Sequence, residues 1–127
     1  MIWAMPYKDP AKQKAYLAQH YKDNKGKYLE NMNRNRIRQR KYLASYLRDL
    51  KEGLPCTDCG QEYHQAVMEF DHVRGEKLGN VGEMVNRAVS LDKLKEEIDK
   101  CEPVCANCHR VRTITRQEEY WYANRKD

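Results

Sequence analysis

Two cysteine pairs of identical spacing constrain this chain more than any other feature. Cys56 and Cys59 form one C-x-x-C pair, and Cys105 and Cys108 form a second pair after residues 60–104. Two residues between the thiolates let a tight turn present both sulfurs to one tetrahedral zinc ion. Four thiolates close such a site, so the pattern predicts a structural zinc that contributes folding free energy.

Other interpretations of the cysteines remain at this stage. A C-x-x-C pair can be a redox dithiol, although such dithiols usually occur singly in a βαβ context. The fifth cysteine, Cys101, could replace one ligand, but its spacing to Cys105 makes a poorer turn. His64 lies close enough to the first pair to compete as a ligand.

The composition agrees with a metal-stabilised fold. The chain has 127 residues, 40% of them hydrophobic, with a single phenylalanine, so its core must be thin. A bound metal can supplement so thin a core in a folded unit this small. The first eight residues lack the apolar run of about 7–15 residues found in signal peptides. No stretch approaches the ~20 apolar residues of a membrane span. We therefore expect a cytoplasmic protein without a membrane segment.

Positive charge is concentrated in the first part of the chain. Residues 1–52 contain 13 lysines and arginines against 5 acidic residues, whereas residues 53–127 contain 11 against 14. A basic arm joined to a mildly acidic module suggests a polyanion partner, most simply nucleic acid, and we expect double-stranded DNA. The alternative is a solvated helix that packs through a few leucines. The candidate phosphate contacts of the arm are Arg36, Arg38, Arg40 and Lys41.

The sequence predicts three parts: a basic, mainly helical arm (1–53), a metal module (54–115) and a C-terminal helix (116–127). In the arm, Asn24 and Gly26 are expected to separate a short helix from a longer one that ends before Gly53 and Pro55. In the module we expect strands at 67–72 and 102–104, and helices at 83–88, at 91–100 behind Ser90, and from about residue 106. Thr115 and Glu118 have the capping-box spacing that would start the last helix.

An acid and two histidines accompany the cysteines. Asp71 and His72 are adjacent at the end of the first expected strand, and His109 directly follows Cys108. In a regular strand neighbouring side chains point to opposite faces, but this alternation can relax at a strand end. A carboxylate and an imidazole suit a divalent ion that polarises a phosphate, and a second imidazole can act as general base.

These motifs together resemble those of the HNH endonuclease family, the ββα-metal nucleases, in the subgroup with two zinc-binding C-x-x-C pairs. The similar segments are 56–59, 70–73 and 104–110, within residues 54–115. The resemblance implies an α+β fold with a small treble-clef-like module, and hydrolysis of nucleic-acid phosphodiesters with Mg²⁺, Mn²⁺ or another divalent ion. It implies that His72 is the general base and that Asp71 and His109 are ligands of the catalytic ion.

The chain departs from the family at the middle Asn, whose position falls at Lys100. Asn107 and Asn86 are the candidate substitutes for its role in bracing the loop beside the base. The candidate phosphate contacts of the module are Arg74, Arg110 and Arg112. The basic arm resembles the accessory DNA-binding arms attached to small phage or bacterial HNH proteins.

Three functional hypotheses follow. The first is a metal-dependent DNA endonuclease or nickase. The second is a non-catalytic, zinc-stapled nucleic-acid-binding module. The third is an adaptor whose tyrosine-rich helices bind a protein partner, such as a DNA-processing or packaging protein.

Overall fold

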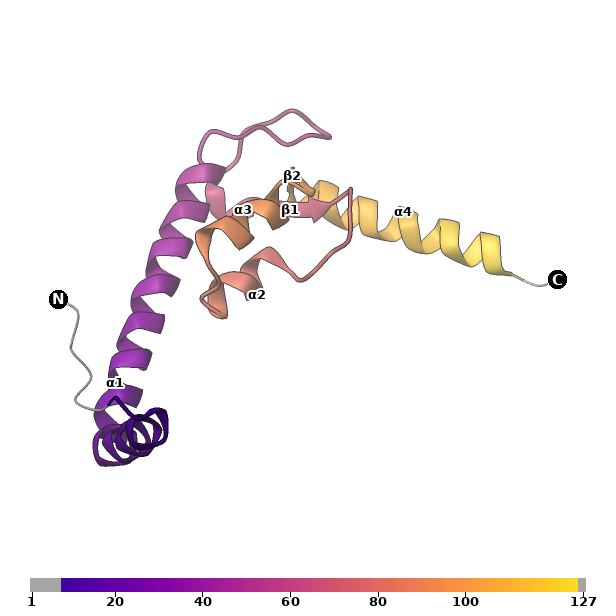
Figure 1. Ribbon diagram of the computed structural model, residues 1–127. Coiled ribbons are helices and arrows are strands. Elements are labelled where there is room, and N and C mark those ends of the chain that lie inside the picture. Colours follow the sequence, from indigo (N-terminus) through magenta and orange to yellow (C-terminus); the bar gives the residue numbers. More distant parts are fainter. Residues whose placement is uncertain (1–7, 126–127) are drawn as a thin grey trace. The chain divides into compact units, whose positions relative to one another are not determined.

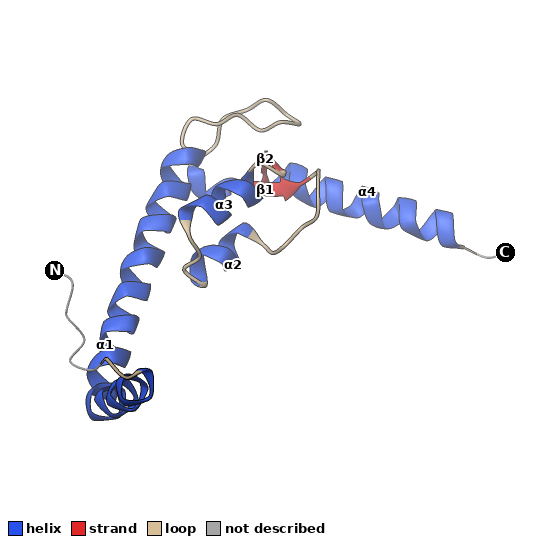
Figure 2. Cartoon of the chain, in the orientation of Figure 1, coloured by secondary structure: helices blue, strands red, loops and turns tan. Residues whose placement is uncertain are grey.

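The computed structural model describes residues 8–125 and has an α+β fold (Figures 1 and 2). The chain divides into two compact units at the bond between Arg38 and Gln39. The first unit holds most of a long N-terminal helix. The second holds the end of that helix, both strands, the cysteines and the remaining helices. In the described part of the chain, no helix has an apolar stretch long enough to cross a membrane.

The N-terminal arm is one helix, α1 (Pro10–Lys51), of 42 residues. The expected interruption near Asn24 and Gly26 is therefore wrong. A glycine inside a helix costs about 1 kcal/mol relative to alanine. The lysines on both sides of it favour helix, and the Asn24 side chain donates back to the carbonyl of His20 (2.8 Å), one turn earlier. The expected end is confirmed, because Gly53 has the positive φ (+73°) that follows many helices.

An antiparallel pair of strands lies at the centre of the second unit. Strand β1 (Met68–His72) pairs with β2 (Cys101–Cys105), so that Met68 faces Cys105 and His72 faces Cys101. Helices α2 (Val81–Asn86) and α3 (Leu91–Ile98) form the connection between the strands. Ser90 caps α3, as predicted, by accepting a hydrogen bond from the Lys93 N–H (3.3 Å).

The helix that follows β2 is α4 (Ala106–Asn124), which begins where expected. No second helix starts at Thr115, so the capping-box prediction is wrong. The Thr115 hydroxyl instead donates to the Val111 carbonyl (2.9 Å) one turn earlier. A threonine bonded in this way is accommodated inside a continuous helix.

Two small apolar clusters hold the second unit together. One packs the last turns of α1 against α2 and α3; its buried members are Leu43, Leu47, Val81, Met84, Val85, Leu94 and Cys101. The other lies below the first cysteine turn; its buried members are Cys56, Met68, Val104 and Cys105. Both are thin, as the composition predicted, and the second is built around cysteines that could hold a metal.

Candidate metal centre and adjoining cleft

The four cysteines predicted as zinc ligands lie together. Their sulfur atoms are all within 4.8 Å of one another. Zn–S bonds of about 2.3 Å in a tetrahedron would place sulfurs about 3.8 Å apart, so this donor set fits one zinc ion. The group joins the turn before β1 to the junction of β2 and α4, which fixes the start of the module against its end.

In the turns around the cysteines, backbone N–H groups donate to the sulfurs of Cys56 and Cys105. Gly60 has a positive φ (+73°), and its N–H donates to the Cys56 carbonyl (2.9 Å). The backbone N–H of Cys105 donates to the Cys56 sulfur (3.3 Å). Burial opposes ionisation of Cys56, but backbone N–H groups, including those of Cys59 and Cys105, outweigh it and lower the thiol pKa to about 6. A thiol with such a pKa readily becomes the thiolate that zinc requires.

The alternative ligands have other roles. Cys101 is buried in the cluster formed by α1, α2 and α3, and its thiol donates to the Glu97 carbonyl (3.3 Å). Burial raises its pKa to about 11. The His64 side chain accepts a hydrogen bond from the Ala66 N–H (3.1 Å) at the start of a short 3₁₀ turn. Neither belongs to the four-sulfur group.

Arg112 connects the first cysteine turn to the strands. Its guanidinium donates to Asp58 (2.6 and 2.7 Å), to Asp71 (2.9 Å) and to Glu102 (2.7 Å). Hydrogen bonds to these carboxylates, that of Asp58 foremost, hold the pKa of Arg112 above its ordinary value. The sequence suggests a phosphate contact at Arg112, but its donors are committed to three carboxylates of the protein.

We expect Arg112→Met to lower the free energy of unfolding by roughly 3 kcal/mol, since it leaves a buried carboxylate with one fewer cation. Urea unfolding followed by circular dichroism, at constant zinc, measures the change. Arg110→Met is the matched control, because Arg110 is exposed on the same helix and should change stability by less than about 0.5 kcal/mol. Equal effects of the two substitutions would contradict a bracing role for Arg112.

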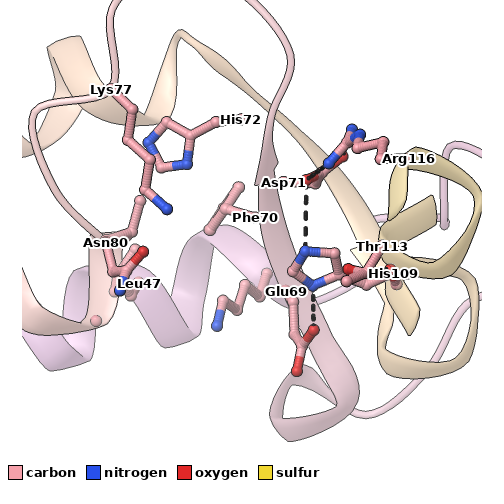
Figure 3. Close-up of a pocket in the computed structure, with 13 residues that line it drawn as sticks. Leu47, Glu69, Phe70, Asp71, His72, Lys77, Asn80, His109, Thr113 and Arg116 are labelled. Carbon is pink, nitrogen blue, oxygen red and sulfur yellow. Dashed lines mark hydrogen bonds and ion pairs between the residues drawn. The ribbon is translucent and has the colours of Figure 1, made fainter. Parts of the chain in front are cut away.

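His109 lies between two carboxylates of β1 (Figure 3). Its Nδ1 contacts Glu69, and its Nε2 lies 3.4 Å from Asp71 Oδ1. Glu69 and Asp71 are two residues apart and therefore share a face of the strand. Thus the structure brings together Asp71 and His109, the two residues that the sequence suggests as ligands of a catalytic ion.

Asp71 is nearly inaccessible, with 4% of its surface exposed, yet it is charged. Arg116 donates to both of its oxygens (2.8 and 2.6 Å), and Arg112 donates to one (2.9 Å). These hydrogen bonds, Arg116 first, outweigh burial and lower the pKa of Asp71 to about 2. The carboxylate is therefore ionised throughout the physiological pH range.

His72 lies on the other face of β1 from Asp71 (Figure 3). It remains paired with Cys101 in the strand ladder, so the alternation does not relax at this strand end. Its Nε2 is 2.8 Å from Oε1 of Glu97 on α3. Asp71 and His72 thus do not converge directly on one point.

A single cleft of about 650 Å³ nevertheless reaches both histidines. It opens beside β1, and its wall includes His72, His109, Asp71 and Glu69. Three cations also line it: Lys51, Lys77 and Arg116. The cleft therefore combines ionisable groups that can move protons with positive charges that attract a phosphate.

The remaining predicted residues, the candidate phosphate contacts and the candidate loop brace, do not gather at one site. Arg74 binds the carbonyls of Asp99 and Cys101, while Arg110 is exposed on α4. The four candidate contacts on α1 are all exposed: Arg36, Arg38, Arg40 and Lys41. The Arg40 guanidinium also lies 3.5 Å from the side-chain oxygen of Asn86. Asn107 is exposed in the first turn of α4.

The sequence reasoning missed Glu97, Glu69, Lys51, Lys77 and Arg116. The sequence did contain a signal for Glu97. It lies three residues after Leu94 and directly before Ile98, and so falls on the apolar side of α3. Glu69 precedes Asp71 by two residues, the spacing of one strand face. The cations carried no signal, because only the folded chain brings them to the cleft.

Comparisons with protein-family models, with curated proteins and with solved structures found no match for this chain.

Proposed function

We propose that this protein is a metal-dependent endonuclease of the HNH kind that hydrolyses phosphodiester bonds of DNA. The observation that carries the proposal is the approach of His109 on α4 to Asp71 on β1 (3.4 Å), beside a four-cysteine cluster and in a cleft that also holds His72. The sequence motifs point to each of these residues independently of their neighbours in space.

The donor pair fits a small divalent ion. Two neighbouring ligands on one Mg²⁺, with bonds of about 2.1 Å, lie about 3 Å apart, close to the separation of Asp71 Oδ1 and His109 Nε2. Arg116 also bonds Oδ1 (2.8 Å), and half of its side chain is exposed, so it can move when an ion binds. When bound there, the ion would polarise the phosphate and stabilise the leaving oxygen.

The protein's own residues account for the other requirements of hydrolysis. A neutral His72 can accept a proton from an attacking water, which is the role of a general base. Lys51, Lys77 and a displaced Arg116 can neutralise phosphate oxygens along the cleft. The basic residues of α1 would contact the backbone of double-stranded DNA beyond the scissile bond.

The test is incubation of the zinc-loaded 127-residue chain with supercoiled plasmid and Mg²⁺, Mn²⁺ or Ni²⁺, each added separately. We expect nicked or linear DNA that requires an added ion, with reactions lacking the ion as controls. Protein carrying His109→Ala, purified in parallel, reports any contaminating nuclease and should not cleave. An intact plasmid with all three ions would overturn the proposal.

One observation favours a second candidate, a zinc-stapled DNA-binding module without catalysis. Within residues 8–125, only the four cysteines form a group of three or more metal-ligand side chains with converging atoms. Plasmid that is retarded on a gel but uncut with every ion would support this candidate.

A further inference from the structure

Glu97 is the most deeply buried charged side chain in the described part of the chain, with 1% of its surface exposed. It lies on α3, and its carboxylate contacts the ring of His72 on β1. Its carboxylate accepts three hydrogen bonds, from His72 Nε2 (2.8 Å), from the Leu78 N–H (3.0 Å) and from Lys100 Nζ (2.9 Å). A buried carboxylate is costly unless it is satisfied in this way, so the arrangement is specific.

The charge of Glu97 decides where His72 carries its proton. Burial alone would raise the pKa of Glu97, but the hydrogen bonds from Lys100, Leu78 and His72 lower it to about 2. An ionised carboxylate only accepts hydrogen bonds, so Nε2 of His72 must be the donor. In the neutral ring the lone pair is then on Nδ1. Among residues 8–125, no group forms a hydrogen bond with Nδ1.

Glu97 also fixes the turn that follows β1. Lys100, held by Glu97, donates to the Glu76 carbonyl (2.7 Å), and its own carbonyl accepts the N–H groups of Val73 and Arg74 (2.9 and 3.2 Å). Gly75 has a positive φ (+68°), and the aliphatic part of Lys100 packs beside it. One carboxylate thus holds both the histidine ring and the segment that leads to Lys77 at the cleft wall.

We propose that Glu97 is the positioning residue for His72: it fixes the tautomer protonated at Nε2 and leaves Nδ1 as the atom that accepts the proton of the attacking water. The role in water activation rests on the proposed nuclease function. The tautomer itself does not depend on that function. An experiment can therefore disprove the tautomer assignment and the nuclease function independently of each other.

The first test is a long-range ¹H–¹⁵N correlation spectrum of the zinc-loaded 127-residue chain, at a pH where the imidazoles are neutral. The His72 resonances are identified by their loss in His72→Gln. We expect the Nε2–H tautomer for His72. A ring protonated at Nδ1, or an equal mixture of tautomers, would overturn the proposal without any measurement of activity.

The second test compares Glu97→Gln with Glu96→Gln, which removes an exposed carboxylate from the neighbouring position of α3. The amide that Glu97→Gln introduces can donate to His72 as well as accept from it, so we expect both tautomers to be populated. In plasmid cleavage, kcat should fall about 10- to 100-fold, the usual effect of removing a residue that orients an active group, with KM unchanged. Glu96→Gln should behave as the parent in both measurements.

The outcomes separate the explanations. A Glu97→Gln protein that loses stability but keeps the parent's tautomer and kcat would show a purely structural role and overturn the proposal. If Glu97→Gln does not fold, the spectrum of the parent still decides. If the parent holds the expected tautomer but cuts no DNA, the proposed function fails, and with it the assignment of Nδ1 as proton acceptor.

Discussion

Replacing Cys56 with serine is expected to abolish zinc binding by the four-cysteine group and to unfold the module that contains both strands. Cys56 is 2% exposed, belongs to the apolar cluster with Met68 and Val104, and contributes one of the four converging sulfurs. Structural zinc contributes roughly 10–16 kcal/mol in small zinc domains. Whole domains are stable by only about 5–15 kcal/mol. Loss of one ligand therefore removes a free energy comparable to the whole stability of the fold.

Elemental analysis and thermal unfolding measure this effect. We expect about one zinc per chain in the parent and much less in Cys56→Ser, together with loss of the cooperative transition. Cys101→Ser is the matched control, because Cys101 is also buried but lies outside the sulfur group. It should retain its zinc and a cooperative transition. A Cys56→Ser protein that keeps its zinc and unfolds cooperatively would contradict the four-thiolate site.

The features that the sequence predicted correctly are those set by local geometry. Two residues between cysteines suffice to make each turn, so Cys56, Cys59, Cys105 and Cys108 could be identified without knowledge of the fold. Gly53 after α1 and Ser90 before α3 act within one helical turn, and both are confirmed. The extent of α1 and α4 was misjudged for a related reason. Local break signals such as Gly26 and Thr115 were outweighed by the helix propensity of long flanking segments.

The features that escaped prediction depend on contacts between distant segments. Glu97 lies 25 residues from His72 in the sequence, and a charged residue in a short helix is usually exposed. Arg112 was expected to face a phosphate because nothing in the sequence showed that Asp58, Asp71 and Glu102 would surround it. The pairing of His72 with Cys101 kept its side chain opposite to Asp71, which required knowledge of the strand register. The residues of the site could therefore be predicted from the sequence, whereas their hydrogen-bond and ion-pair partners could not.

Substitution of His72 by alanine is the test that separates catalysis from binding. General acid–base groups contribute roughly 10²- to 10⁴-fold, so plasmid cleavage by His72→Ala should fall by at least about a hundredfold. Retardation of the plasmid and the zinc content should not change, because His72 is neither a cysteine-group ligand nor part of α1. Glu97 keeps its bonds to Lys100 and to the Leu78 N–H, so its charge remains satisfied and the module should stay folded.

His64→Ala is the matched control, since His64 belongs to the same module, lies outside the cleft and serves only a 3₁₀ turn. It should cleave as the parent does. If His72→Ala also cleaved at the parental rate, the base would have to be another group. His109, the second histidine of the cleft, would then be the next candidate, with Glu69 and Asp71 as its partners. If His72→Ala loses cleavage but keeps DNA binding and zinc, and His64→Ala cleaves as the parent does, then His72 is the group that takes the proton from water. The attacking water then lies on the face of β1 where Glu97 contacts His72.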